Sequence, residues 1–388
     1  MNKLIRITTI PLSLEKLLGG GQMHFMNNYF RVIAVSSHKE KLEDVGSKEG
    51  VGTFHIDLTR RITPFKDLKA LWKLFRFLRS EKPLIVHTHT PKAGTIGMIA
   101  AWLARVPIRM HTVAGMPLLE VTGKKRVILE RVEKITYHCA SRVYPNSLGL
   151  QQIIINNKFC RPEKLKVLAH GSSNGIDTSH FDPLKISSAQ KSALRKDLGI
   201  EEKEFVFIFV GRLVTDKGIK EVVNAFDSAI SKHIGVKLLL VGDMEPELDP
   251  LEAAVIRTIH NNINIISAGF QDDVRPYMAI SDLLVFPSYR EGFPNVVMQA
   301  GAMGVPAIVT DINGCNEIIQ EGKNGTLIPV KNVEALQEKM DYFIQNPQQL
   351  KTLATNAREM IVSRYEQKMV WEAILAEYQK LEKSLPHV

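Results

Sequence analysis

Two segments of this 388-residue chain place charged side chains beside glycines at the ends of apolar runs. In the first, Gly211 and Arg212 follow the run FVFIFV, and Lys217 and Gly218 precede the apolar-periodic stretch IKEVVNAF. A helix N-terminus offers backbone N–H donors and a partial positive charge, so an adjacent arginine and lysine would complete a diphosphate site. The alternative for either cation alone is a solvated loop charge.

The second segment, FPSYREGFPNVVMQ, places the carboxylate of Glu291 on a loop after a buried apolar run. A carboxylate in this place suits sugar hydroxyls, and the backbone amides near it suit a phosphate. Gln299 lies eight positions further on, so the two side chains do not share a helix face; Glu291 would act from the loop and Gln299 from the helix. We expect four residues between them to let the backbone approach a ligand: Gly292, Phe293, Pro294 and Asn295.

The elements that must position these residues alternate between short apolar runs and helical stretches, and the pattern restarts near Phe205. This alternation predicts an α/β fold with two Rossmann-like, doubly wound domains that face each other across a cleft. The expected boundaries are an N-terminal domain at 1–175, a linker rich in Gly, Ser, Asn and Asp at 176–204, a second domain at 205–364, and a helix at 365–388 that packs back towards the N-terminal domain. Ligands of such sheets bind outside the carboxyl ends of the strands.

The composition indicates a soluble globular protein with an acidic partner. The net charge of +9 implies an acidic partner. The chain has three widely separated cysteines, Cys139, Cys160 and Cys315, and this odd number suits a reducing compartment better than a set of disulfides. There is no signal-peptide pattern and no apolar run long enough for a membrane span. The sequence contains no Cys/His cluster and no DxD-type pair of carboxylates at a strand end, so no metal site is indicated. We therefore expect a cytoplasmic protein that binds no metal.

Residues 64–79 predict a basic amphipathic helix. Lys66, Lys69 and Lys73 share one face, Leu68 is expected on the opposite, core-facing side, and Phe77 falls on the basic side. A basic face with an exposed aromatic suits a helix that lies against anionic lipid, here the cytoplasmic face of the inner membrane. An ordinary surface helix packed on a sheet is the alternative.

The segments GRLVTDKG, SYREGFPNVVMQAGAMGVP and NGIDTSHF together resemble the retaining GT-B glycosyltransferases of family four, over nearly the whole chain. The resemblance implies that Glu291 contacts a donor sugar and that Arg212 and Lys217 hold its diphosphate. Family members usually carry a second glutamate where this chain has Gln299, a position that contacts the ribose hydroxyls. An amide there cannot form a charge-assisted bond, so we expect weaker donor binding.

In the N-terminal half, HTHTPKAGTIGMIAAWLARVP and RMHTVAGMP resemble the members that build bacterial capsule and O-antigen on polyprenyl carriers. The resemblance implies that His111 reaches the donor sugar. The acceptor-side candidates are Gly20, Gly21, His89 and Lys92. The glycine run is expected in a loop after the first strand, where small residues would let an acceptor come close.

The implied reaction transfers a hexose or N-acetylhexosamine from a nucleoside-diphosphate donor to a polyprenyl-diphosphate-linked saccharide, with retention at the anomeric carbon. The resemblance to the family favours a UDP-sugar as the donor. No cofactor and no nucleic acid are expected. Two alternatives stay open: a non-catalytic GT-B homologue acting as a partner subunit, which Gln299 favours, and a sugar-nucleotide epimerase. A nicotinamide-dependent dehydrogenase is disfavoured because the glycine fingerprint is absent.

Overall fold

The computed structural model describes residues 1–59, 63–247 and 249–385, and for residues 117 and 120 it describes the backbone alone. The chain forms two compact units, one of residues 1–175 with 367–388 and the other of residues 176–366. The C-terminal helix is thus part of the N-terminal unit. Residues 176–204, expected from the sequence as a linker, are grouped with the second unit.

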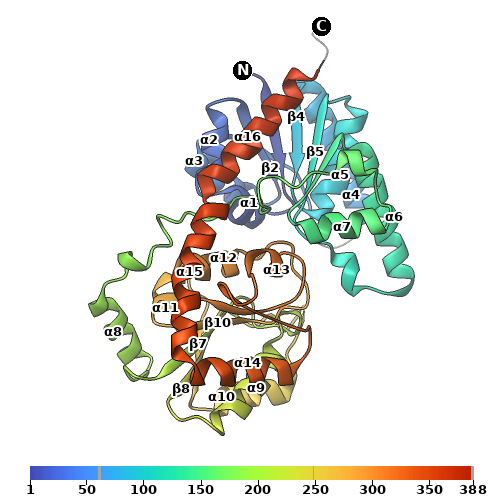
Figure 1. The fold of residues 1–388 in the computed structure, drawn as a ribbon. Helices are drawn as coiled ribbons and strands as arrows, with labels where there is room; N and C mark the ends of the chain where they lie inside the picture. The colour runs from blue at the N-terminus through green and yellow to red at the C-terminus, as the bar shows by residue number, and fades with distance from the viewer. Residues whose placement is uncertain (60–62, 248, 386–388) are drawn as a thin grey trace. The chain divides into compact units, whose positions relative to one another are not determined.

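Each unit is built on a six-stranded parallel sheet, as the alternating pattern predicts (Figure 1). The first sheet has the order β3-β2-β1-β4-β5-β6, with β1 (Lys3–Ile7), β2 (Arg31–Ser36), β3 (Gly52–His55), β4 (Ile85–Thr88), β5 (Ile108–Val113) and β6 (Arg142–Pro145). The second has the order β12-β11-β10-β7-β8-β9, with β7 (Phe205–Val210), β8 (Val236–Val241), β9 (Ile265–Gly269), β10 (Leu283–Phe286), β11 (Ala307–Thr310) and β12 (Gly325–Ile328). Both orders reverse beside the first strand of the sheet, which is the doubly wound arrangement.

Helices connect the strands in both units. Those of the first unit are α1 (Pro11–Leu18), α2 (Gln22–Asn27), α3 (Lys39–Glu49), α4 (Pro64–Glu81), α5 (Pro91–Leu103), α6 (Gly123–Cys139), α7 (Leu148–Asn156) and α16 (Gln367–Lys383). Those of the second unit are α8 (Ser188–Asp197), α9 (Ile219–Ile230), α10 (Ala253–Asn261), α11 (Arg275–Ala279), α12 (Asn295–Ala302), α13 (Cys315–Ile318), α14 (Val333–Gln345) and α15 (Pro347–Tyr365).

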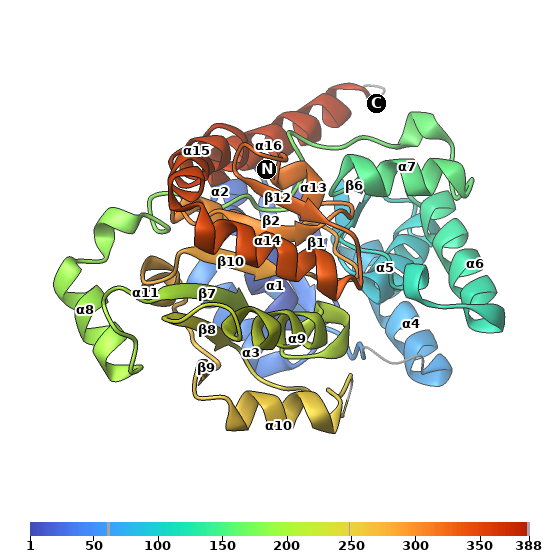
Figure 2. The same cartoon turned by 60° about the horizontal axis from the view of Figure 1, so that its bottom comes forward.

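The first sheet buries both of its faces, because successive side chains of a strand point to opposite sides. Ile5 and Ile7 of β1 pack in a cluster with residues of α4, α5, α6 and α7. Leu4 packs in a second cluster with residues of α1, α2, α3 and α16. Figures 1 and 2 both show α16 lying along this unit. Its Tyr378 is fully buried and contacts the strand residue His87.

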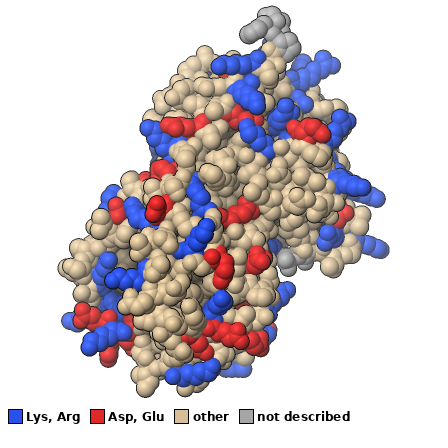
Figure 3. Space-filling model, in the orientation of Figure 1, with Lys and Arg blue, Asp and Glu red and all other residues tan. Residues whose placement is uncertain are grey.

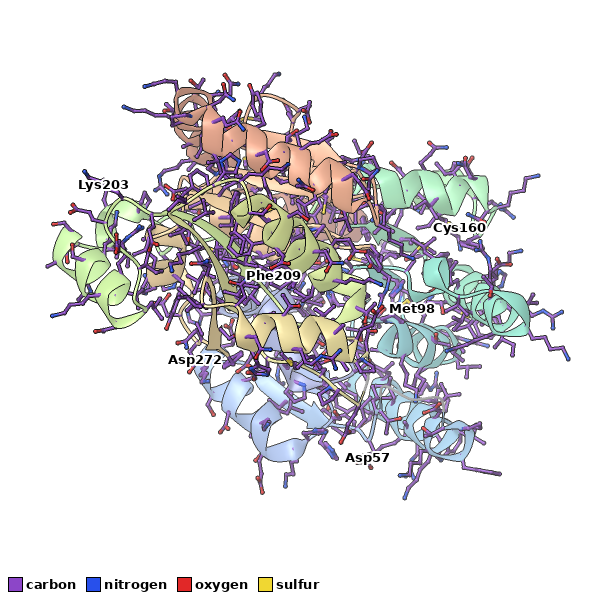
Figure 4. All side chains as sticks on the ribbon, turned by 90° about the horizontal axis from the view of Figure 1, so that it is seen from below. Asp57, Met98, Cys160, Lys203, Phe209 and Asp272 are labelled. Carbon is purple, nitrogen blue, oxygen red and sulfur yellow. The ribbon has the colours of Figure 1, made fainter. Side chains whose placement is uncertain are left out.

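The second unit has one large apolar core. The run FVFIFV forms β7, and four of its members, Val206, Phe207, Ile208 and Phe209, are completely buried. Figure 4 labels Phe209, which stacks on Phe286 of β10 with ring centroids 5.9 Å apart. Continuous apolar runs of this kind are typical of strands covered on both faces. The core therefore fixes the ends of β7 and β10, where the candidate site residues follow.

Two details of the predicted basic helix are wrong. Helix α4 spans the segment, but Phe77 is not exposed: its ring stacks on Phe54 at 3.8 Å with planes 11° apart. Leu68, expected on the core side, is 65% exposed, as are Phe65 and Trp72 at 91% and 60%. The exposed apolar side chains of α4 are thus different ones from those that the sequence suggested. The reason is that the strand residue Phe54 provides an aromatic partner that helical periodicity cannot reveal.

Charge is mixed over the molecular surface. Figure 3 shows Lys and Arg side chains interspersed with Asp and Glu on the visible face, so the net charge of +9 is not gathered there in a single patch. Within residues 1–59, 63–247 and 249–385, no helix combines the length and apolarity needed to cross a membrane.

Candidate functional site

The loops that follow β7 and β10 pack directly on each other. Gly218 has a left-handed backbone (φ +72°), and a Cβ at this position would lie 2.3 Å from the carbonyl oxygen of Pro287. Only a residue without a side chain tolerates both conditions. The backbone N–H of Tyr289 also donates to the carbonyl of Asp216 at 2.9 Å. The close approach brings the side chain before Gly218 to the end of β10.

Lys217 and Glu291 meet at this point. The ammonium of Lys217 donates to Oε1 of Glu291, and the hydroxyl of Ser288 donates to the same oxygen at 2.7 Å. The two charged side chains are only 15% and 14% exposed. Partial burial strengthens their attraction and holds both groups in place. The structure therefore joins two of the residues that the sequence nominated, although they are far apart in the chain.

Arg212 follows the carboxyl end of β7 and has acidic partners of its own. Its guanidinium donates to Glu245 at 2.7 Å, and a second nitrogen lies 4.0 Å from Asp216. Burial acts to lower the pKa of Arg212, but the hydrogen bond to Glu245 and the neighbouring carboxylates outweigh it and raise the pKa. Arg290 donates to Asp216 at 2.8 Å. Both arginines are thus paired with carboxylates. A phosphate group of a ligand would have to compete with these carboxylates for the arginines.

The start of α12 is built against another close backbone contact. Gly314 has φ +78°, and a Cβ there would lie 2.4 Å from the carbonyl oxygen of Gly292. Asn313 donates to the carbonyl of Glu291, and Phe293 is buried with its ring 5.3 Å from that of Tyr365. The loop that carries Glu291 is therefore anchored on both sides. Pro294 precedes the first helical residue in an extended conformation, as is common at an N-cap.

Gln299 lies in α12 and is partly exposed. Within the described part of the chain its side-chain amide makes no hydrogen bond to another protein group. The neighbouring residues Met298 and Ala300 are buried in the core, so the helix itself is fixed. The side-chain amide of Gln299 is therefore available to a ligand.

In the first unit, His111 is buried within β5, two residues before the end of the strand. Its Nδ1 lies 2.8 Å from the hydroxyl of Thr88, and burial lowers its pKa to about 4. The ring is neutral near neutral pH and can exchange hydrogen bonds but carries no charge. Gly94 of α5 makes room for it, because a Cβ there would lie 2.4 Å from Cε1 of the ring.

The remaining nominated residues of this unit have protein partners. His89 is 1% exposed, and its Nε2 lies 3.3 Å from the buried guanidinium of Arg6. Lys92 is 2.7 Å from Asp67 and donates to Thr59 at 3.0 Å. These contacts tie Lys92 to the start of α4.

The two glycines do not follow the first strand directly, since α1 intervenes. A Cβ on Gly20 would lie 3.1 Å from Gln367, and one on Gly21 would lie 3.3 Å from Trp371. Both positions therefore bring the backbone close to α16. No local sequence signal indicates this packing, because the partner residues lie at the other end of the chain.

Sequence reasoning missed the acidic partners of the site. Glu245 follows β8 in the segment VGDMEPE, and Asp216 stands one residue before Lys217. A buried run ending in Gly-Asp was the available signal for the first. Among the residues that the structure describes, no three His, Cys, Asp or Glu side chains converge as a metal ion would require.

Comparisons with known proteins agree with this architecture. Residues 190–360 match the family model "Glycosyl transferases group 1", and residues 29–171 match "Glycosyl transferase 4-like domain". The capsular polysaccharide biosynthesis glycosyltransferase CapM of Staphylococcus aureus is 32% identical over 379 residues, 97% of this chain and 96% of that protein.

Two further relatives carry names that specify their reactions. The UDP-Gal:alpha-D-GlcNAc-diphosphoundecaprenol alpha-1,3-galactosyltransferase of Escherichia coli is 29% identical over 87% of this chain and 86% of its own length. The N,N'-diacetylbacillosaminyl-diphospho-undecaprenol alpha-1,3-N-acetylgalactosaminyltransferase of Campylobacter jejuni is 26% identical over 92% of both.

Solved structures share the fold. The Anabaena protein HepE in complex with UDP superposes with a TM-score of 0.78 at 21% identity, covering 98% of this chain and 100% of that one. A glycosyltransferase from Rickettsia africae gives 0.81 at 18% identity, covering 99% of both chains.

Proposed function

Because this chain belongs to the group 1 glycosyltransferases, we propose that it transfers a hexose or N-acetylhexosamine from a UDP-sugar to a saccharide on a polyprenyl diphosphate. The enzyme class follows from the family. The choice of acceptor is supported by the relatives from Escherichia coli and Campylobacter jejuni, whose names specify diphosphoundecaprenol-linked substrates. The choice of donor is supported by the Escherichia coli relative, whose name specifies UDP-Gal. The capsular relative from Staphylococcus aureus supports a role in polysaccharide biosynthesis.

The observation that carries the donor assignment is the ion pair of Lys217 and Glu291 beside Arg212. A leaving diphosphate develops negative charge, and fixed cations in a partly buried site stabilise it. Lys217 and Arg212 supply that charge, so the mechanism that we propose needs no bound metal. When Lys217 turns to the phosphates, the carboxylate of Glu291 is released to accept bonds from the sugar hydroxyls.

We assign the remaining donor contacts to three elements. The backbone from Gly292 to Asn295 lies at the start of α12, where N–H groups suit a phosphate. Gln299 would contact the ribose hydroxyls. His111, neutral because burial lowers its pKa to about 4, would exchange a hydrogen bond with the donor sugar.

Transfer would proceed with retention at the anomeric carbon. The transition state would be oxocarbenium-like, with the acceptor hydroxyl attacking from the face that the diphosphate leaves. The leaving diphosphate would take the proton of that hydroxyl. The cations would then stabilise the same oxygen atoms throughout the reaction, so the positive site would need no rearrangement between steps.

We further propose that the enzyme contacts the membrane through α4. Phe65, Leu68 and Trp72 are exposed on this helix, next to Lys69 and Arg76. Aromatic and aliphatic side chains flanked by basic ones suit the interface of a bilayer with anionic lipids.

Incubation of the protein with labelled UDP-glucose, UDP-galactose and their N-acetylated forms, together with an undecaprenyl-diphosphate-linked monosaccharide, tests the function. We expect one donor to give a lipid-linked disaccharide whose new linkage is α by NMR, which is retention. A β linkage would contradict the stereochemistry. Release of an epimerised UDP-sugar without transfer would contradict the reaction class.

A further inference from the structure

A small cavity lies inside the first unit, between the carboxyl ends of β4 and β6 and the helix α16. Its volume is about 10 Å³, which is room for roughly one water-sized species. His89 and Asn146, which directly follow the two strands, line it together with Ser172, Ser173 and Ile374 of α16. Cavities that stay dry are apolar, so this polar lining indicates an occupant that forms hydrogen bonds.

A buried positive charge stands beside this cavity. The side chain of Arg6, in β1, is fully buried; it donates to Oε1 of Gln22 at 2.6 Å and lies 3.3 Å from Nε2 of His89. Both partners are uncharged. Among the residues that the structure describes, no carboxylate forms an ion pair with Arg6, and Glu49, which attracts it from further away, accepts from backbone N–H groups at the start of α2. An arginine stays charged even where burial lowers its pKa, so a negative partner is expected nearby.

The ring of His89 presents a hydrogen-bond donor that has no acceptor. Burial lowers the pKa of His89 well below its ordinary value, and the charges of His87 and Arg6 act in the same direction, so the ring is neutral. A guanidinium can only donate, so Nε2 of His89 accepts and the hydrogen of the ring is on Nδ1. In the described part of the chain this buried Nδ1 has no hydrogen-bond partner, and neither has the buried Nε of Arg6.

Ser172 adds a further donor to the wall. Its hydroxyl oxygen accepts from the backbone N–H groups of Asn174 and Gly175 at 3.4 and 3.1 Å, which leaves the hydrogen of the hydroxyl for the cavity. Donors and a positive charge favour an occupant that only accepts hydrogen bonds. A metal cation would be repelled by Arg6, and a phosphate or carboxylate group is larger than the space. A monatomic anion satisfies both conditions.

We propose that this cavity binds one chloride ion, which accepts hydrogen bonds from Nδ1 of His89 and the hydroxyl of Ser172 and neutralises the charge of Arg6. The ion stabilises the first unit, because it removes the cost of a buried charge without a counter-ion. It also holds the strand ends against α16, whose Ile374 closes the cavity. This site is separate from the donor site of the second unit and does not depend on which sugar is transferred.

Thermal unfolding of the wild type in mixtures of sodium chloride and sodium gluconate at constant ionic strength tests the proposal, since gluconate is too large to enter. From about 1 to about 200 mM chloride, the melting temperature should rise by roughly 2 to 4 °C and level off as the site fills. Bromide should act as chloride does, and crystals grown in sodium bromide should show its anomalous signal beside His89. A melting temperature that is indifferent to chloride would overturn the proposal, because the cavity would then hold water.

Two variants locate the effect in the cavity. Ser172→Gly removes the donor hydroxyl at a residue with φ +68°, a left-handed conformation that glycine adopts freely, so the variant should keep the fold. Arg6→Met removes the charge that requires a counter-ion. Both should lose most of the chloride-dependent rise, whereas Arg31→Met, at an exposed position, should keep it. A full chloride response in Ser172→Gly would contradict the assignment even if Arg6→Met did not fold.

Discussion

Lys217 and Glu291 form a hydrogen-bonded ion pair although they lie 74 positions apart in the chain. The hydroxyl of Ser288 adds a second donor to the same carboxylate oxygen at 2.7 Å. The pair carries no net charge, and Glu291 is also among the carboxylates that raise the pKa of Arg212. In the function that we propose, a diphosphate enters by taking the place of Glu291 as the partner of Lys217.

Glu291→Gln should separate binding from turnover. The amide keeps the size of the side chain but releases Lys217 from its counter-ion, so we expect UDP affinity to be equal to or higher than that of the wild type. The transfer rate should fall by on the order of 100-fold, because the carboxylate no longer holds the sugar in the transition state. Calorimetry and initial rates measure the two effects. Glu252→Gln, which alters an exposed partner of Lys220, is the control. A parallel loss of UDP affinity would contradict the assigned role.

Gln299→Glu should strengthen donor binding. The partly exposed amide of Gln299 makes no bond to protein groups of the described chain, and a carboxylate in its place would accept charge-assisted bonds from a ribose diol. We expect UDP to bind roughly tenfold more tightly, equivalent to about 1.4 kcal/mol. With 2′-deoxy-UDP most of the gain should vanish. An equal gain for both nucleotides would place the residue away from the ribose.

The stability of the protein should fall as the pH falls from about 6.5 towards 4. Burial lowers the pKa of His111 to about 4, and it lowers the pKa of His87 and His89 as well. The unfolded chain therefore takes up these protons first, so stability is full above the ordinary pKa and is lost on acidification. For His111 the loss amounts to about 3 kcal/mol by pH 4.

Urea unfolding of the wild type and His111→Gln across this pH range measures the effect. The variant should show a smaller loss on acidification, whereas His138→Gln, at an exposed position, should follow the wild type. Identical pH profiles for wild type and His111→Gln would contradict the burial of a neutral ring at this place.

Membrane attachment should depend on the apolar side chains of α4. Replacing Phe65, Leu68 and Trp72 by serine should abolish flotation with phosphatidylglycerol liposomes, because we propose that these exposed side chains enter the interface. The control replaces three exposed apolar residues of the second unit, Leu184, Ile263 and Phe270, by serine. Equal flotation of both variants would remove α4 from the contact.

Much of the fold could be predicted because its signals are local. The run at 205–210 and its equivalents become strands buried on both faces, as continuous apolar runs indicate. The positions of Arg212 and Lys217 next to a strand end and a helix start followed in the same way. The counter-ions of these two residues could not be predicted in this way. Glu245 contacts Arg212 and Glu291 contacts Lys217 across the ends of different strands.

The errors have the same physical origin. Phe77 was expected to be exposed because helical periodicity places it among lysines, but Phe54 of a neighbouring strand covers it. Gly20 and Gly21 were expected in a loop directly after the first strand, but α1 intervenes, and the structure brings both close to α16, whose residues lie more than 300 positions away. Contacts between segments distant in sequence decide which small or apolar residues remain accessible to a ligand.

The central claim is that Lys217 holds the diphosphate of a uridine nucleotide, and calorimetric titration with UDP tests it most directly. Wild type and Lys220→Ala, a variant at an exposed lysine of α9, should bind UDP equally. Lys217→Ala should bind it on the order of 10- to 100-fold more weakly, since a charge-assisted contact is lost. An unchanged dissociation constant for Lys217→Ala, in a protein with the melting temperature of the wild type, would contradict the account.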